Sequence, residues 1–182
     1  MSQNPPRPGS EPRKPRPARH SILEDAASVP TITTPGLGPF EYRDEDVLTF
    51  PEGLPAFEKL RFFVLAQALE FAPFVFLVSL ERPSVRFVCA PLVLLAPDYA
   101  FELLPGESIP AGLEPGHYAA ASGTHLLLAI LTLPEHAPPT ANLVAPVLIH
   151  SVRRVGVQVI LAGSAYSHVT PLPLLLAGGA PC

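Results

Sequence analysis

Proline and glycine interruptions constrain this chain more than any other feature of its sequence. The 182 residues include 25 prolines and 12 glycines, and between residues 35 and 110 these breakers recur at short intervals. Proline inside a helix removes a backbone hydrogen bond and clashes with the preceding turn, so long helices do not fit here. A helical bundle is therefore excluded. No Gly-x-y period accompanies the prolines, which excludes a collagen-like chain.

Short segments rich in Val, Phe, Leu and Ile lie between the breakers. Their length and spacing are typical of an antiparallel β-barrel or sandwich. We therefore predict an all-β fold, a small antiparallel β-barrel-like domain with short loops and little helix, whose one or two helical turns lie within residues 105–120. The predicted strands are Ile32–Thr34, Phe40–Tyr42, Val47–Phe50, Arg61–Ala66, Phe74–Leu80, Arg86–Ala90, His125–Leu133, Val147–His150 and Val155–Leu161.

Three of these segments carry further information. Residues 61–65 and 74–78 are nearly continuous apolar runs, which is typical of central strands covered on both faces. Residues 155–161 alternate instead, so that Val155, Val157, Val159 and Leu161 share one face.

The length and the charge distribution divide the chain into a tail and one domain. A chain of 182 residues is too short for two ordinary domains. Residues 1–30 are rich in Pro and Arg, offer little to bury, and are predicted to form a disordered tail, so residues 31–182 form the single domain. From residue 21 onward 7 basic residues stand against 15 acidic ones. A net charge near minus 8 favours basic partners and disfavours nucleic acid as a ligand.

The apolar runs also bear on the compartment. Residues 87–97 and 126–133 are about half as long as a membrane-spanning helix requires. We interpret both runs as core strands and expect no membrane association. The first thirty residues contain five basic side chains but no apolar core of a signal peptide, so a cytoplasmic location is predicted. Cys89 and the terminal Cys182 are poorly placed for a disulfide, which suits a reducing compartment.

The sequence gives little sign of catalytic or cofactor chemistry. The six histidines show neither an HxxxH pair nor a cysteine at ligand spacing, so we expect no metal site. Gly163–Ser167 lacks the second glycine of a nucleophile elbow and is interpreted as a turn. Apolar neighbours should raise the pKa of Cys89 and leave it inert. Neither form of glycine-rich phosphate loop is present, and no cofactor is predicted.

The acidic residues are the remaining candidates for function. Asp44, Glu45 and Asp46 cluster before a predicted strand, and residues 98–103 interleave aromatic and carboxylate side chains. Such acids commonly form a solvated face. Aromatic anchors surrounded by charge also suit a protein-binding surface, because the anchors supply burial and the charges steer a basic partner. Both interpretations stay open on this evidence.

Six motifs in a fixed order resemble the FliW-type flagellar assembly factors over about residues 31–171. The first, FPEGLPAFE at residues 50–58, is similar to that family's F-P-x-G-L-P-G-F-E element. The others are FVCAP (87–91), DYAFEL (98–103), LTLPE (131–135), TANLVAPVLI (140–149) and GVQVIL (156–161). Ala56 stands where the family usually has glycine, and Ala90 where a polar residue is common.

The resemblance implies a small β-barrel protein without catalytic activity that acts by partner exchange. It implies binding to cytoplasmic flagellin and, when flagellin is scarce, to the carbon storage regulator CsrA, a repressor of flagellin translation. Two alternatives are kept: a chaperone that binds only flagellin, and a small barrel enzyme that uses Glu81, Asp98 or a histidine in a cleft.

The resemblance also implies roles for individual residues of the matching motifs. Asp98 and Tyr99 match the family's D-Y element, and we expect them to bind the repressor together with Glu81 and Glu102. The remaining motif residues are expected to be structural: Phe50, Gly53, Pro55 and Phe57 around a tight reversal, Asn142 holding a turn through its side-chain amide, and Pro146 in the motif that follows.

Overall fold

In the described part of the chain, seven strands close into a barrel. The computed structural model describes residue 1, residues 29–105 and residues 111–173. Each strand of the barrel pairs with the next, and the pairing of β11 with β9 closes the ring. Six junctions are antiparallel, whereas β12 and β3 run parallel. In order around the barrel the strands are β11 (Val147–His150), β12 (Val155–Gln158), β3 (Leu48–Thr49), β4 (Phe62–Ala66), β5 (Val75–Ser79), β6 (Arg86–Pro91) and β9 (His125–Thr132).

Smaller elements are added to this barrel. Two antiparallel hairpins form separate sheets, and two short strands extend the barrel sheet beyond β9. The hairpins are β1 (Thr31–Thr34) with β2 (Gly38–Glu41) and β7 (Ala100–Leu103) with β8 (Gly116–Ala119); the extension is β10 (Thr140–Ala141) and β13 (Thr170–Pro171). The described helices are short: η1 (Asp44–Asp46), η2 (Leu69–Phe71) and α1 (Leu92–Leu95).

Alternation along the strands divides the apolar side chains between the barrel interior and its outer faces. In β5, Val75 and Leu77 belong to a buried cluster that takes members from β3, β4, β6, β9 and β11. Only the interior of a closed barrel brings side chains from all these strands together. Phe76 and Val78 of β5 point outward and pack under Ile32 of the β1–β2 hairpin.

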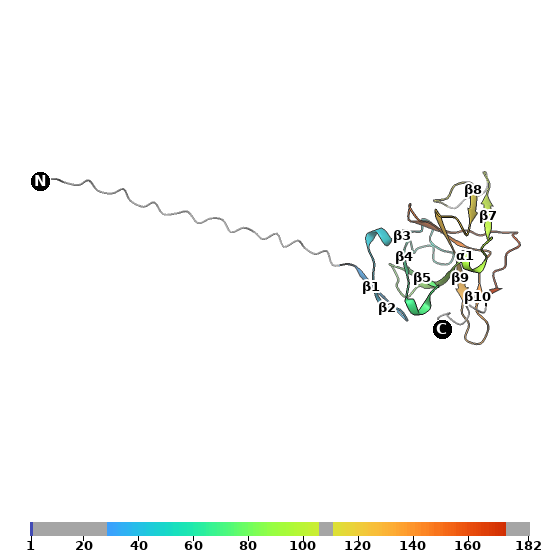
Figure 1. Cartoon of the computed structure of the whole chain (residues 1–182), viewed down its shortest axis with the longest axis horizontal. Helices are drawn as coiled ribbons and strands as arrows, with labels where there is room; N and C mark the ends of the chain where they lie inside the picture. The colour runs from blue at the N-terminus through green and yellow to red at the C-terminus, as the bar shows by residue number, and fades with distance from the viewer. Residues whose placement is uncertain (2–28, 106–110, 174–182) are drawn as a thin grey trace.

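The second hairpin covers another outer face. Phe101 and Tyr118, from β7 and β8, pack in one buried cluster with Leu127, Leu148 and Val157 of the barrel. The two aromatic rings stack with their centroids 5.3 Å apart. In Figure 1 the β7–β8 hairpin lies at the end of the barrel away from β10. The barrel is thus covered on both sides of several strands, which explains why their sequences are so apolar.

The predicted fold class is confirmed: the described residues are nearly all β, with little helix and a barrel in which six of the seven strand pairings are antiparallel. The prediction for residues 74–78 also holds, because every residue of β5 is buried and the strand lies between β4 and β6. The prediction for residues 61–65 needs correction at Phe62, which is 46% exposed. Val64 and Ala66 share its outer face and pack under the β1–β2 hairpin, but Phe62 lies outside that cluster.

The helical turn lies in a different place from the predicted one. The sequence favoured residues 105–120, whereas α1 occupies Leu92–Leu95, within a run interpreted as strand. Pro91 ends β6 with a φ of −58°, an angle that suits the start of a helix, and the N–H of Ala96 donates to the carbonyl of Leu92 at 2.8 Å. Residues 111–120 contain a turn and β8, and residues 106–110 lie outside the described residues.

Two expectations fall on parts of the chain that the structure does not describe. Of the predicted tail at residues 1–30, only residues 1, 29 and 30 are described, and Cys182 is not. Within the described residues, no helix combines the length and the hydropathy needed to cross a membrane.

Candidate partner-binding groove

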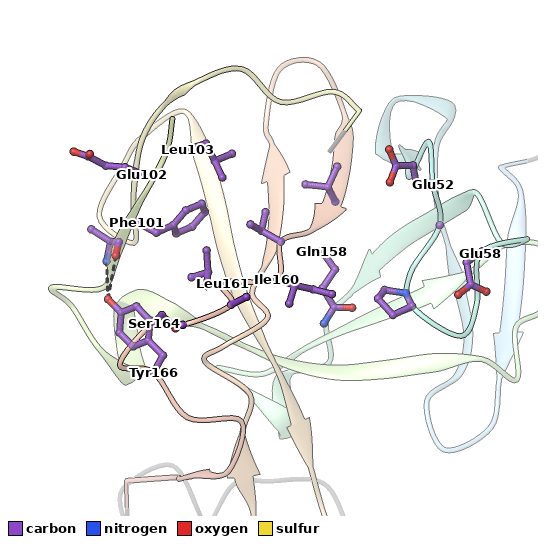
Figure 2. Close-up of a pocket in the computed structure, with 17 residues that line it drawn as sticks. Glu52, Glu58, Phe101, Glu102, Leu103, Gln158, Ile160, Leu161, Ser164 and Tyr166 are labelled. Atoms are coloured by element: carbon purple, nitrogen blue, oxygen red, sulfur yellow. Dashed lines mark hydrogen bonds between the residues drawn. The ribbon is translucent and has the colours of Figure 1, made fainter. Parts of the chain in front are cut away.

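A groove of about 790 Å³ opens beside β7. Its lining comes from β7, from residues 157–164 in and after β12 together with Tyr166, and from the turn that contains Glu52 and Glu58. Figure 2 shows Glu102 on one side, Glu52 and Glu58 on the other, and Ile160 between them. No Lys, Arg or His is among the described lining residues, so the groove is acidic.

The turn at one side of the groove depends on a glycine. Gly53 has a φ of +70°, and a Cβ there would lie 2.7 Å from the Cα of Glu58. Glycine alone tolerates this conformation and close approach without strain. The N–H of Phe57 donates to the carbonyl of Leu54 at 2.7 Å and completes the reversal. Ala56, where the family motif has glycine, also adopts a positive φ, of 68°.

Backbone amides of the same turn fix the Glu58 carboxylate. Its Oε1 accepts the N–H of Ala56 at 2.8 Å. Hydrogen bonds from the backbone N–H groups of Glu58 and Ala56 lower the pKa of the Glu58 carboxyl, and the positive charge of Arg61 adds to the effect. Glu52 is held as well, because its Oε1 accepts the N–H of Ala111 at 3.1 Å. Both charges therefore have defined positions at the groove.

Glu81, expected to bind a partner, makes backbone contacts of its own. Its carboxylate accepts the N–H of Arg61 at 2.9 Å and the N–H of Phe62 at 3.0 Å. These bonds tie the residues after β5 to the start of β4. Glu81 is exposed but does not line the groove.

Tyr99 is buried, which corrects the expectation that its ring lies on a binding surface. It is 1% exposed, and its hydroxyl donates to the carbonyl of Leu143 at 2.5 Å. Burial raises the pKa of Tyr99, and the neighbouring Tyr166 adds to the rise. The alternation of this segment places Tyr99 and Phe101 toward the core and Asp98 and Glu102 toward solvent.

Of the four residues predicted to bind a partner, the structure places only Glu102 in the groove. Its Oε1 lies 3.8 Å from Nδ1 of His117 on the facing strand β8, and both side chains are exposed. Asp98 is exposed just before β7 but does not line the groove. Sequence reasoning had included Glu52 and Glu58 only as parts of a turn motif. The available signal for their position in the groove was the presence of an acid on each side of Gly53 in this motif.

The remaining motif residues occupy structural positions. Phe50 is fully buried, and its ring packs edge to face on Phe63 with centroids 4.9 Å apart. Phe57 packs against Phe87 at a centroid distance of 5.3 Å. Asn142 Oδ1 accepts the N–H of Ala145 at 3.1 Å and closes a turn. Further described positions are Pro55, exposed in the groove wall, and Pro146 and Ala90, both buried.

A second, smaller cavity of about 240 Å³ holds three histidines. The rings of His125 and His150 meet edge to face with centroids 4.9 Å apart, and Arg153 is beside them. Burial lowers the pKa of His125, and the nearby His150 and Arg153 add to the effect. A search of the described residues finds no group of His, Cys, Asp or Glu arranged to hold a metal ion.

Two possible nucleophiles have surroundings that do not activate them. Burial raises the pKa of the Cys89 thiol to about 12, in agreement with the sequence analysis. The N–H of Ser164 donates to the carbonyl of Leu161 at 3.2 Å and closes a turn, and among the described residues the Ser164 Oγ is buried without a hydrogen-bond partner. A serine nucleophile needs a neighbouring base, and no base in the described residues is hydrogen-bonded to the Ser164 hydroxyl.

Comparison with known proteins gives a consistent family. The model of the FliW protein family matches residues 31–172. Flagellar assembly factor FliW of Caldanaerobacter subterraneus subsp. tengcongensis is 36% identical over 138 residues, which are 74% of this chain and 87% of that protein. Flagellar assembly factor FliW of Shouchella clausii is 32% identical over 149 residues, which are 81% of this chain and 98% of that protein.

A solved structure agrees with the sequence comparisons. The crystal structure of a flagellar assembly factor FliW superposes with a TM-score of 0.64 at 30% identity, over 79% of this chain and 98% of that one. The family model extends from residue 31 to residue 172, a range that includes all seven barrel strands and the turn with Gly53. Sequence, fold and motif order therefore agree that this chain belongs to the FliW family of flagellar assembly factors.

Proposed function

We propose that this protein is a non-catalytic, cytoplasmic flagellar assembly factor that exchanges two protein partners. In this proposal it binds flagellin, and when flagellin is scarce it binds the carbon storage regulator CsrA and relieves repression of flagellin translation. Accumulated flagellin then occupies the factor and restores repression. The observation that carries the proposal is membership of the FliW family over residues 31–172.

The charge of the protein supports a basic partner. An RNA-binding repressor carries positive charge on the surface that binds phosphates, and opposite charges increase the rate of association. Here the acids Glu52, Glu58 and Glu102 line one groove without a basic residue among the described lining. The same charge disfavours direct binding of nucleic acid or of an anionic membrane surface.

The surroundings of the acids favour binding over catalysis. A general acid at neutral pH needs a raised carboxyl pKa. Hydrogen bonds from the turn lower the pKa of Glu58 instead. Glu81, which the enzyme alternative invoked, accepts two backbone N–H groups. These contacts suit fixed negative charges that attract a partner.

Calorimetric titration of the full chain tests the proposal. Flagellin and CsrA of the same organism are titrated separately, and flagellin is then added to the preformed complex with CsrA. We expect saturable binding of each partner and displacement of CsrA by flagellin. Binding of flagellin alone would reduce the protein to a chaperone, and binding of neither would refute the proposal.

A further inference from the structure

The two barrel strands β12 and β3 differ in length, and this leaves a backbone edge open in the groove. β3 ends at Thr49, where its N–H donates to the carbonyl of Arg154 at 2.8 Å. After Thr49 the chain turns away through Phe50 and Pro51. The backbone that follows β12 continues to pair with residues 144–146, on the side away from β3. The N–H of Val159 donates to the carbonyl of Pro146 at 2.9 Å, and the N–H of Leu161 donates to the carbonyl of Val144 at 2.9 Å.

The alternation of hydrogen bonds in a strand identifies the groups that remain open. In an antiparallel pair only every second residue directs its N–H and C=O toward the partner strand. The backbone N–H groups of Val159 and Leu161 point toward residues 144–146. The backbone N–H and C=O groups of Gln158 and Ile160 therefore point the opposite way. No hydrogen bond to the backbone N–H of either is found among the described residues. Both residues line the groove.

Side chains beside this edge provide the other elements of a peptide site. Ile160 is 64% exposed, although it lies in an apolar segment. Glu52 and Glu58 are held on one wall by backbone N–H groups, and Glu102 lies on the other (Figure 2). An open strand edge, an exposed apolar side chain and fixed acids on both walls together fit an extended, basic peptide.

We infer that the groove binds an extended segment of a protein partner by strand addition to the edge at residues 158–160. The bound segment lies beside β12 beyond the end of β3, and its backbone pairs with Gln158 and Ile160. Main-chain hydrogen bonds supply affinity in this mode, and alternate side chains supply specificity. The matching segment alternates apolar residues with Lys or Arg. This inference concerns the binding mode, and it holds whichever partner supplies the segment.

A synthetic peptide tests the inference on the full-length chain. The probe is a dye-labelled, amidated Lys-Val-Lys-Val-Lys-Val-Lys peptide, and binding is followed by fluorescence anisotropy. We expect saturable binding that weakens as salt rises, because Glu52, Glu58 and Glu102 attract the lysines. Absence of saturable binding at low salt would refute the inference.

Two variants at one position separate backbone pairing from side-chain contact. Ile160→Pro removes the open N–H without removing a described hydrogen bond, and proline is tolerated on a strand edge. Ile160→Ala keeps that N–H and removes only the side chain. We expect a loss of affinity of about tenfold or more for Ile160→Pro and about threefold for Ile160→Ala. Equal losses in the two variants would contradict strand addition.

Modified peptides make the same test without changing the protein. Two versions of the probe carry N-methyl groups on alternate residues, one set at the valines and one at the lysines. An extended chain directs alternate N–H groups to opposite edges, so only one set blocks pairing with residues 158–160. We expect the two versions to differ by about tenfold in affinity. Equal affinity would overturn the inference even if Ile160→Pro failed to fold.

Discussion

The hydroxyl of Tyr166 takes the place of a neighbouring strand at Ala100. It accepts the N–H of Ala100 at 3.3 Å and donates to the carbonyl of the same residue at 3.0 Å (Figure 2). Ala100 is the first residue of β7, and these two groups face away from β8. The Tyr166 ring also stacks on Tyr99 with centroids 4.2 Å apart. The Tyr166 side chain thus provides hydrogen-bond partners for the backbone N–H and C=O of Ala100 at the β7 edge, at one end of the groove, and helps to bury Tyr99.

Replacing Tyr99 tests whether its buried hydroxyl is structural. Tyr99→Phe removes the hydrogen bond to the Leu143 carbonyl and leaves that buried oxygen without this donor. We expect the free energy of unfolding to fall by about 1–3 kcal/mol. Urea denaturation measures the loss. Tyr42→Phe is the matched control, because the described structure shows no hydrogen bond to the Tyr42 hydroxyl, and it should change stability by less than about 0.5 kcal/mol.

Ala56→Gly should stabilise the protein. Ala56 has a φ of 68°, a conformation that costs an L-residue with a Cβ about 1–2 kcal/mol. Glycine removes this cost but adds freedom to the unfolded chain, so we expect a net gain of about 0.5–1 kcal/mol. Thermal and urea unfolding measure it. Ala119→Gly, at a strand position without positive φ, should instead be destabilising, and the same sign for both variants would refute the explanation.

Gly156→Ala should destabilise the barrel because Phe50 occupies the space that a Cβ needs. A Cβ at Gly156 would lie 2.3 Å from the Phe50 ring. Overpacking of this kind costs about 1–3 kcal/mol. Gly116→Ala is the control, since no atom lies within 4 Å of its Cβ position. In a double-mutant cycle with Phe50→Leu we expect the penalty at Gly156 to shrink, and strictly additive losses would exclude the proposed clash.

The lowered pKa of His125 predicts a dependence of stability on pH. The unfolded chain keeps a pKa near 6.5 at this residue, whereas burial, His150 and Arg153 lower it in the folded protein. The unfolded state therefore binds the proton first, and stability falls as pH drops below about 6.5 through the folded pKa. Urea unfolding at about pH 7.5 and about pH 5.5 should show a larger loss for the wild type than for His125→Gln.

A second histidine supplies the control for this experiment. His136 has a side chain 94% exposed, so its replacement by glutamine should leave the pH dependence of the wild type unchanged. If His125→Gln and His136→Gln lose stability in parallel with the wild type, burial of His125 does not contribute to the pH dependence.

The double substitution Asp98→Lys/Glu102→Lys tests electrostatic steering of the proposed repressor. Both side chains are exposed, one just before β7 and one within it. We expect CsrA to associate about tenfold more slowly, with a weaker salt dependence than for the wild type and little change in the dissociation rate. Stopped-flow kinetics measure both rates. Glu45→Lys/Glu135→Lys makes the same change in net charge outside the groove, and an equal effect would remove Asp98 and Glu102 from the interface.

The sequence by itself determined the class of fold. Proline and glycine limit the backbone locally, so their spacing excluded long helices and marked most strand boundaries. Residues 147–150, for example, form β11 as predicted. The strand prediction for the apolar run 87–97 was wrong at residues 92–95, which form α1, because a segment of this length has no period that separates strand from helix. The motif order was sufficient to identify the family.

Only the tertiary structure decided what the candidate site contains. Pairing of β11 with β9 closes the barrel, and this contact joins residues far apart in the chain. Burial of Tyr99 depends on the Leu143 carbonyl, 44 residues away. The groove is lined by β7, by the turn around Gly53 and by the segment in and after β12, which are brought together from distant parts of the chain. Local patterns record how a strand alternates, but long-range packing determines which side chains and edges remain exposed.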